Sequence, residues 1–167
     1  MLSRIGLTLC AVLVAGSATL FAPTLAFAQT AQDLVGTWQI VSVVNTAEDG
    51  TKSNVFGPDL KGTAIFAADG RFAYIVMRAN LPNFASGNRL QGTPEENKAI
   101  VQGSMAYFGT YAVADKAMTW HIEGSAWPAW TGMDQKQSII AFSKNEMTIQ
   151  HGAAIMGSNV VVLKRAN

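Results

Sequence analysis

The chain has 167 residues, of which 49% are hydrophobic and 14% charged, and its formal net charge is +1. A nearly neutral chain without a cluster of basic residues argues against nucleic acid or an anionic membrane as a partner. The length suits one domain, and because Cys10 is the only cysteine, the domain holds no internal disulfide.

The N-terminal segment has the features of a secretory signal peptide. Residues 1–4 are short and basic, residues 5–25 form an apolar run, and an Ala-Phe-Ala cleavage site ends at Ala28. We therefore expect a signal peptide at 1–28, a mature domain at 29–167, and a periplasmic or secreted protein that is not held at the membrane after cleavage.

The rest of the chain alternates β-rich segments with turn residues, the pattern of an all-β domain. Short, evenly spaced strands in sequential hairpins favour an eight-stranded antiparallel up-and-down barrel, with a sandwich as the alternative. The eight predicted strands are residues 34–44, 60–67, 71–78, 105–114, 117–124, 135–142, 146–150 and 159–164.

One short helix is predicted between strands three and four. Thr93 and Glu96 have the spacing of a capping box, and Pro94 occupies the first helical position. The helix should run over about 94–102. It is either a lid over the barrel or a plain connection, and the sequence favours neither.

The strand at 117–124 carries the sharpest candidates for chemistry. Side chains alternate faces along a strand, so one face is polar and the other apolar. We expect the polar face to line a cavity, although a solvent-facing polar row is the alternative. The polar row is Thr119, His121, Glu123 and Ser125, and the apolar row is Met118, Trp120 and Ile122.

An ordered series of motifs from Leu34 to Arg165 resembles the lipocalin-like domain family, a branch of the calycin class. The resemblance implies an eight-stranded barrel with a cavity, and it implies no particular reaction. It also implies that Trp38 closes one end of the barrel under a basic side chain, Arg165 or Lys164. The motifs are Gly36-Thr37-Trp38, Phe56-Gly57-Pro58, Asp69-Gly70-Arg71, Phe84-Ala85-Ser86-Gly87, Gly92-Thr93-Pro94-Glu95-Glu96, Tyr107-Phe108-Gly109-Thr110-Tyr111, His121-Ile122-Glu123-Gly124-Ser125 and Trp127-Pro128-Ala129-Trp130.

These features favour a barrel that binds a small, partly apolar ligand, with aromatic walls and a few polar anchors. Trp127 and Trp130 either frame the mouth of the barrel, or cap its end or pack under the predicted helix. The expected ligand-binding residues are His121, Glu123, Tyr107, Tyr111, Arg78, Trp127 and Trp130.

Two other functions stay open at this point. The first is a small cofactor-free isomerase, cyclase or hydrolase with His121 and Glu123 as acid and base. The second is a structural or oligomer-forming barrel with a filled interior. No metal-ligand spacing, glycine-rich phosphate loop or nucleophile elbow occurs, so we expect no metal and no cofactor. Binding is favoured over catalysis because no nucleophile–base–orienter set can be traced.

Overall fold

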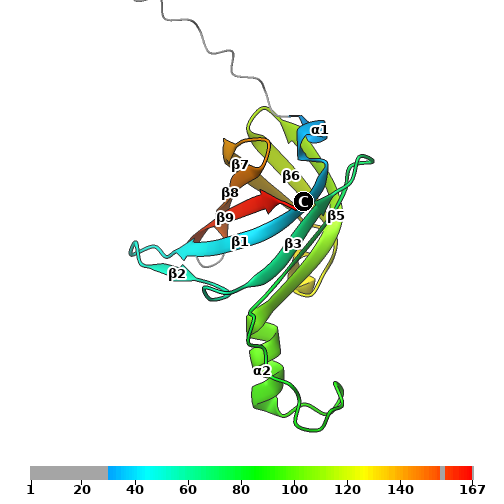
Figure 1. The fold of residues 1–167 in the computed structure, drawn as a ribbon, viewed down its shortest axis with the longest axis vertical. Coiled ribbons are helices and arrows are strands. Elements are labelled where there is room, and N and C mark those ends of the chain that lie inside the picture. The colour runs from blue at the N-terminus through cyan, green and yellow to red at the C-terminus, as the bar shows by residue number, and fades with distance from the viewer. Residues whose placement is uncertain (1–29, 155–156, 167) are drawn as a thin grey trace, which may run out of the picture.

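The computed structural model describes residues 30–154 and 157–166, so the predicted signal peptide lies outside the described residues. More than half of this part of the chain lies in one antiparallel sheet (Figure 1). Its elements are α1 (Ala31–Leu34), β1 (Gly36–Thr46), β2 (Lys52–Asn54), β3 (Lys61–Phe66), β4 (Arg71–Met77), α2 (Pro94–Gly103), β5 (Ser104–Ala114), β6 (Ala117–Ser125), the 3-10 turn η1 (Pro128–Trp130), β7 (Asp134–Phe142), β8 (Glu146–Ala154) and β9 (Gly157–Arg165).

The sheet closes on itself as an eight-stranded barrel. Each strand from β3 to β9 pairs antiparallel with the next, β1 pairs with β3, and β1 also pairs with β9. The short β2 pairs with the far end of β1 and stands outside the closed circuit. The predicted up-and-down barrel is therefore confirmed, and the sandwich alternative is wrong because β1 bonds to both β3 and β9.

Register within the barrel follows from the turn residues. In the β3–β4 hairpin, Gly70 has φ 83° and its N–H donates to the Ala67 carbonyl. The Asp69 carboxylate accepts from the backbone N–H of Arg71 at 3.1 Å. Asp-Gly tolerates the positive φ of such tight turns, so this dipeptide fixes which residues of the two strands face each other.

One end of the barrel is closed by Trp38 at the start of β1. Its side chain is fully buried, and its indole N–H donates to the Leu34 carbonyl at 2.8 Å. The Arg165 guanidinium lies 4.2 Å from the centre of the indole ring, within cation–π range. We call this end the closed end. Arg165 rather than Lys164 covers the ring, because Lys164 points outward on the alternate face of β9.

The guanidinium of Arg165 also donates hydrogen bonds to two separate parts of the chain. It donates to the backbone carbonyls of Val35 and Asp33, beside α1, and to that of Lys144, in the β7–β8 turn, each at 2.8 Å. Arginine's planar fork of donors allows all of these bonds at once, whereas lysine has a single ammonium group. Arg165 thus ties the end of β9 to the segment beside α1 and to the β7–β8 turn.

The predicted helix forms α2. Its capping box is complete, because Thr93 Oγ1 accepts from the N–H of Glu96 at 3.2 Å and the Glu96 carboxylate accepts from the N–H of Thr93 at 2.8 Å. The same carboxylate accepts from the N–H of Ala85, which ties the preceding loop to the helix. In Figure 1, α2 projects away from the barrel at the end opposite α1. In this structure the helix is therefore a projecting arm.

Replacement of Trp38 tests the closed end. We expect Trp38→Ala to lower the free energy of unfolding by about 3–5 kcal/mol, the usual cost of removing a large buried aromatic side chain. Urea denaturation followed by circular dichroism measures it.

The matched control is Trp127→Ala, since Trp127 is 47% exposed. We expect that change to cost less than about 1 kcal/mol, as surface substitutions usually do. Equal costs for the two variants would contradict the assignment of Trp38 as the barrel's closure.

Candidate functional site

The expected orientation of β6 is wrong. Met118, Trp120 and Ile122 are fully buried in the barrel core, and His121 and Glu123 lie on the outer wall. The side chain of His121 is 52% exposed and that of Glu123 is 36% exposed. Neither residue therefore lines the interior.

The apolar row of β6 faces inward and the polar row outward because the two rows differ in the free energy of burial. Burial of apolar surface contributes about 25 cal/mol per Å², whereas a buried carboxylate must be neutralised or paired. On the outer wall both polar side chains find partners. His121 Nδ1 lies 2.8 Å from Asp134 Oδ1 on β7, and Arg71 on β4 donates to Glu123 at 3.2 Å. The two residues therefore belong to separate surface pairs.

A β-bulge at Glu123 breaks the alternation along β6. Phe108 is opposite Gly124 and Gly109 is opposite Ile122, so Glu123 is the extra residue. A side chain at Gly109 would collide with the backbone carbonyl of His121. Glycine at this position lets β5 approach the bulged strand closely.

Three of the other expected ligand residues lie away from the barrel interior or are already engaged. The Tyr111 hydroxyl lies near the closed end, 3.0 Å from the Ala67 carbonyl and 3.3 Å from that of Ala31. Arg78 is exposed and donates to the Val55 carbonyl at 3.3 Å. Trp127 is also exposed.

Tyr107 and Trp130, by contrast, meet at one side of the core. Their rings are 5.5 Å apart and nearly perpendicular, and Trp130 packs against the core from η1. Tyr107 also stacks on Tyr74, its cross-strand neighbour on β4, with centroids 4.8 Å apart. These two expected residues are therefore brought together, with Tyr74 as an unexpected third member.

The interior holds a polar belt that sequence reasoning missed. Its members follow one another as neighbours on β6, β7, β8, β9 and β1, and all lie on the inward face of their strands. Gln135 is opposite Trp120, Gln137 is opposite His151, and Asn159 is opposite both His151 and Asn45. The belt comprises Trp120, Gln135, Gln137, His151, Asn159 and Asn45.

Two buried atoms of the belt have no hydrogen-bond partner within the described residues. They are Nε1 of Trp120, a donor, and Oε1 of Gln137, an acceptor. The two asparagines differ, since Asn45 Nδ2 donates to Asn159 Oδ1 at 3.0 Å. Most buried polar atoms in proteins are paired, so an unpaired donor and an unpaired acceptor are informative.

His151 is the third polar group of this corner. Its ring lies edge-on to Trp120, with centroids 5.6 Å apart. Burial lowers the pKa of His151 to about 4, so the imidazole is neutral at physiological pH. Burial likewise raises the pKa of Tyr74 and of Tyr107 above the usual phenol value. All of these groups are therefore uncharged donors or acceptors.

Strand alternation was the signal that would have revealed the belt. Gln135 and Gln137 are in phase with the core residue Ile139, and His151 is in phase with Ile149. The predicted strand at 146–150 ended one residue too early to include His151, which β8 contains.

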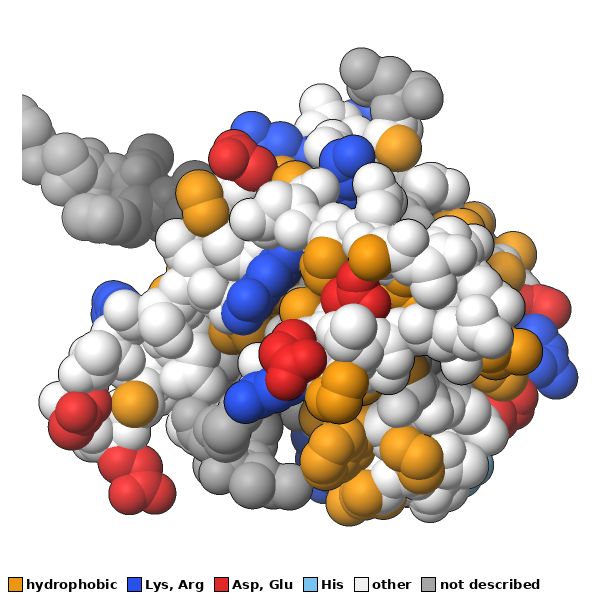
Figure 2. All heavy atoms as spheres, turned by 90° about the horizontal axis from the view of Figure 1, so that it is seen from below, with side chains coloured by type: hydrophobic (Ala, Val, Ile, Leu, Met, Phe, Trp, Pro, Cys, Tyr) orange, Lys and Arg blue, Asp and Glu red, His pale blue; other side chains and the backbone are white. Residues whose placement is uncertain are grey.

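The barrel differs at its two ends. The closed end is packed around Trp38, while Asn45, Gln135 and Asn159 are only partly buried toward the other end. We call this the open end, and α2 projects from it. Seen from the α2 side, the surface shows apolar side chains between scattered charges (Figure 2).

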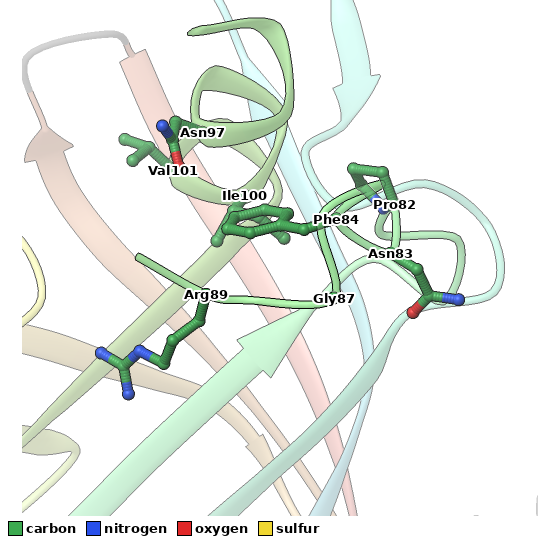
Figure 3. Close-up of a pocket in the computed structure, with 8 residues that line it drawn as sticks. All are labelled: Pro82, Asn83, Phe84, Gly87, Arg89, Asn97, Ile100 and Val101. Carbon is green, nitrogen blue, oxygen red and sulfur yellow. The ribbon is translucent and has the colours of Figure 1, made fainter. Parts of the chain in front are cut away.

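A groove of about 840 Å³ lies on the arm, separate from the belt. Figure 3 shows the Phe84 ring beside Ile100 of α2, with Arg89 extending away from them. Phe84 also packs against Gly92, where a side chain would meet its ring. The groove is lined by Pro82, Asn83, Phe84, Gly87, Arg89, Asn97, Ile100 and Val101.

Within residues 30–154 and 157–166, no three His, Cys, Asp or Glu side chains gather in a way that could hold a metal ion. No helix in these ranges is both long enough and apolar enough to cross a membrane.

The eight antiparallel strands form a closed barrel, which places the protein among the up-and-down β-barrels. Its interior is packed at one end and lined with polar groups toward the other. The sequence profile described as a lipocalin-like domain matches residues 35–160. This chain belongs to the lipocalin-like domain family, as its motifs indicated.

Solved structures give a distant likeness. A lipocalin-like protein from Bacteroides uniformis ATCC 8492 is 16% identical with a TM-score of 0.44, over 79% of this chain and 98% of that one. A redesigned beta barrel bound to DFHBI is 19% identical with a TM-score of 0.41, over 81% and 98%. A mutant of the fluorescent protein UnaG is 14% identical with a TM-score of 0.38, over 81% and 98%. No curated protein sequence matches this chain.

The lowered pKa of His151 makes stability depend on pH. The imidazole titrates near 6.5 in the unfolded chain and near 4 in the folded protein, so between these values only the unfolded state takes up the proton. We expect the free energy of unfolding to fall as pH drops from about 6.5 to about 4, by roughly 2–3 kcal/mol. Urea denaturation at a series of pH values measures this.

Two variants show which histidine causes the pH dependence of stability. His151→Gln should flatten the fall in stability, whereas His121→Gln, at an exposed position paired with Asp134, should keep it. If both variants show the same pH dependence, the buried imidazole is not its source.

Proposed function

We propose that the mature domain is an exported barrel that binds one small, partly apolar ligand in its interior, at the polar belt. The observation that carries the proposal is the pair of unpartnered buried atoms, Trp120 Nε1 and Gln137 Oε1. An unsatisfied buried donor or acceptor costs about 1–3 kcal/mol, and a ligand polar group would recover that cost.

The surroundings of the pair suit a partly apolar ligand. Aromatic rings of Phe72, Tyr74 and Tyr107 pack around Trp120, with centroid distances between 4.9 and 5.8 Å. Ligand sites in proteins are mostly apolar, with a few polar groups that fix orientation. Asn45, Gln135 and Asn159 of the belt are only partly buried, so the belt reaches the protein surface toward the open end.

Catalysis by His121 and Glu123 has less support than ligand binding in the interior. Each side chain already has an oppositely charged or hydrogen-bonding partner, Asp134 and Arg71 respectively. Both are more than one-third exposed, so water screens and competes with any substrate contact there. An acid–base pair needs both groups aimed at one substrate, and these two face separate partners.

Ligand binding can be tested by the quenching of tryptophan fluorescence with a panel of small phenols, carboxylates and lipids. We expect at least one member to bind saturably at one site, and we expect His151→Leu to weaken that binding by roughly tenfold, since about 1–3 kcal/mol follows from an unpaired partner. His121→Leu is the matched control on the outer wall and should bind as the unchanged protein does. An equal loss in both variants would place the site outside the interior.

Export can be tested separately. The Ala-Phe-Ala sequence ending at Ala28 supports cleavage before Gln29. Intact-mass measurement on protein recovered from the native host should give a chain that begins at Gln29. Recovery of the uncut chain from the cytosol would contradict this proposal.

A further inference from the structure

We propose that the ligand of this interior is a neutral, planar molecule that carries a hydrogen-bond acceptor for Trp120 and a donor for Gln137. This inference rests on the proposed function and narrows it to a chemical class. An aromatic carboxamide is a simple member of the class, because its carbonyl accepts and its N–H₂ donates within one flat group.

The neutrality of the ligand follows from the charges of the barrel. Among the described residues every Asp, Glu, Lys and Arg side chain is exposed, except Glu96 on the arm and Arg165 at the closed end, which are partly buried. Arg165 already donates to three backbone carbonyls and covers Trp38. The interior therefore offers no counter-ion to a charged ligand, and an unpaired buried charge is costly.

The uncharged state of the belt strengthens this point. His151 is neutral above its pKa of about 4, and burial keeps the Tyr74 and Tyr107 phenols protonated. Neither the imidazole nor the phenols can balance a carboxylate or an ammonium group. A neutral ligand loses less hydration on entry than a charged one.

The donor and the acceptor of the ligand follow from the two unpartnered atoms. An indole N–H can only donate, so the group that meets Trp120 must accept. A carbonyl oxygen can only accept, so the group that meets Gln137 Oε1 must donate. A site whose buried polar groups must all be paired rejects analogues that lack one partner.

The two atoms come from one corner of the barrel. Met118, two residues before Trp120 on β6, is opposite Gln137 on β7, so Trp120 and Gln137 are diagonal neighbours. Diagonal neighbours on adjacent strands are about 7–8 Å apart at the backbone. His151 closes this corner, since it is opposite Gln137 and its ring contacts Trp120.

The planarity of the ligand follows from the aromatic side chains around Trp120. Phe72 stacks on Trp120 at 4.9 Å, and the rings of Tyr74 and Tyr107 lie tilted to it at 5.8 and 5.7 Å. Aromatic rings prefer offset-stacked or edge-to-face contact with one another. A ligand that reaches the indole N–H of Trp120 meets this group of rings, and a planar aromatic ring makes such contacts with them whereas a branched or flexible chain does not.

The test compares three probes that share one ring system: naphthamide, its methyl ester methyl naphthoate, and naphthoate. The amide has an acceptor and a donor, the ester has an acceptor alone, and the acid is an anion at neutral pH. We expect naphthamide to bind at least about tenfold more tightly than naphthoate and about fivefold more tightly than the ester. Dissociation constants come from tryptophan fluorescence and calorimetry on the mature protein.

Two variants assign the contacts. Gln137→Leu, a substitution that nearly keeps the side-chain volume, should bring the ratio of the ester and amide dissociation constants to about one. Trp120→Phe should weaken the binding of the amide and of the ester by the same factor. Gln39→Leu, at an exposed glutamine on β1, should keep all the dissociation constants of the unchanged protein. An unaltered amide preference in Gln137→Leu would overturn the assignment of the donor contact.

Binding of the probes to the unsubstituted protein distinguishes failure of the neutral ligand class from failure of the proposed function. Saturable binding in which naphthoate equals or exceeds naphthamide would overturn the neutral class and leave interior binding in place. Absence of saturable binding by all three probes and by the wider panel would overturn the proposed function and this inference with it. The probe ranking does not depend on the folding of any variant.

Discussion

The barrel depends on the contact between Trp38 and Arg165, which join the first and last strands as register partners. The indole fills the closed end, and the guanidinium covers its face at 4.2 Å while donating to three backbone carbonyls. A closed sheet leaves no long edge in its main circuit, so this junction replaces what would be two exposed edge strands.

The polar belt lies beside the aromatic core, and Trp120 belongs to both. The belt passes through five adjacent strands, from Trp120 on β6 to Asn45 on β1. The asparagines at one side of the belt bond to each other, while Trp120 Nε1 and Gln137 Oε1 remain unpaired among the described residues. The belt thus contains both hydrogen-bonded and unpaired polar groups. A ligand gains most binding free energy where it pairs with the unpaired ones.

The outer wall follows a different principle. His121 contacts Asp134 on the neighbouring strand β7, and Glu123 reaches across β5 to Arg71 on β4; both contacts are exposed to water. Exposed pairs of this kind contribute little to stability, and they keep a polar surface over a wall that also carries Phe108 and Ile75. A polar row beside an apolar row on one strand therefore indicates an outward polar face when the apolar row is large enough to fill the core.

The sequence by itself determined the elements. Turn residues such as Asp69-Gly70, the capping box at Thr93, and the eight β-rich segments act through local backbone preferences, so the barrel and α2 could be predicted without coordinates. Tertiary structure alone decided which face of each strand lies inside. Alternation is the same for both faces, and only the competition among Trp120, His121 and Glu123 for the limited interior settled it. It also decided that Gln137 and His151, 14 positions apart, lie opposite each other, because cross-strand register depends on the bulge after Ile139.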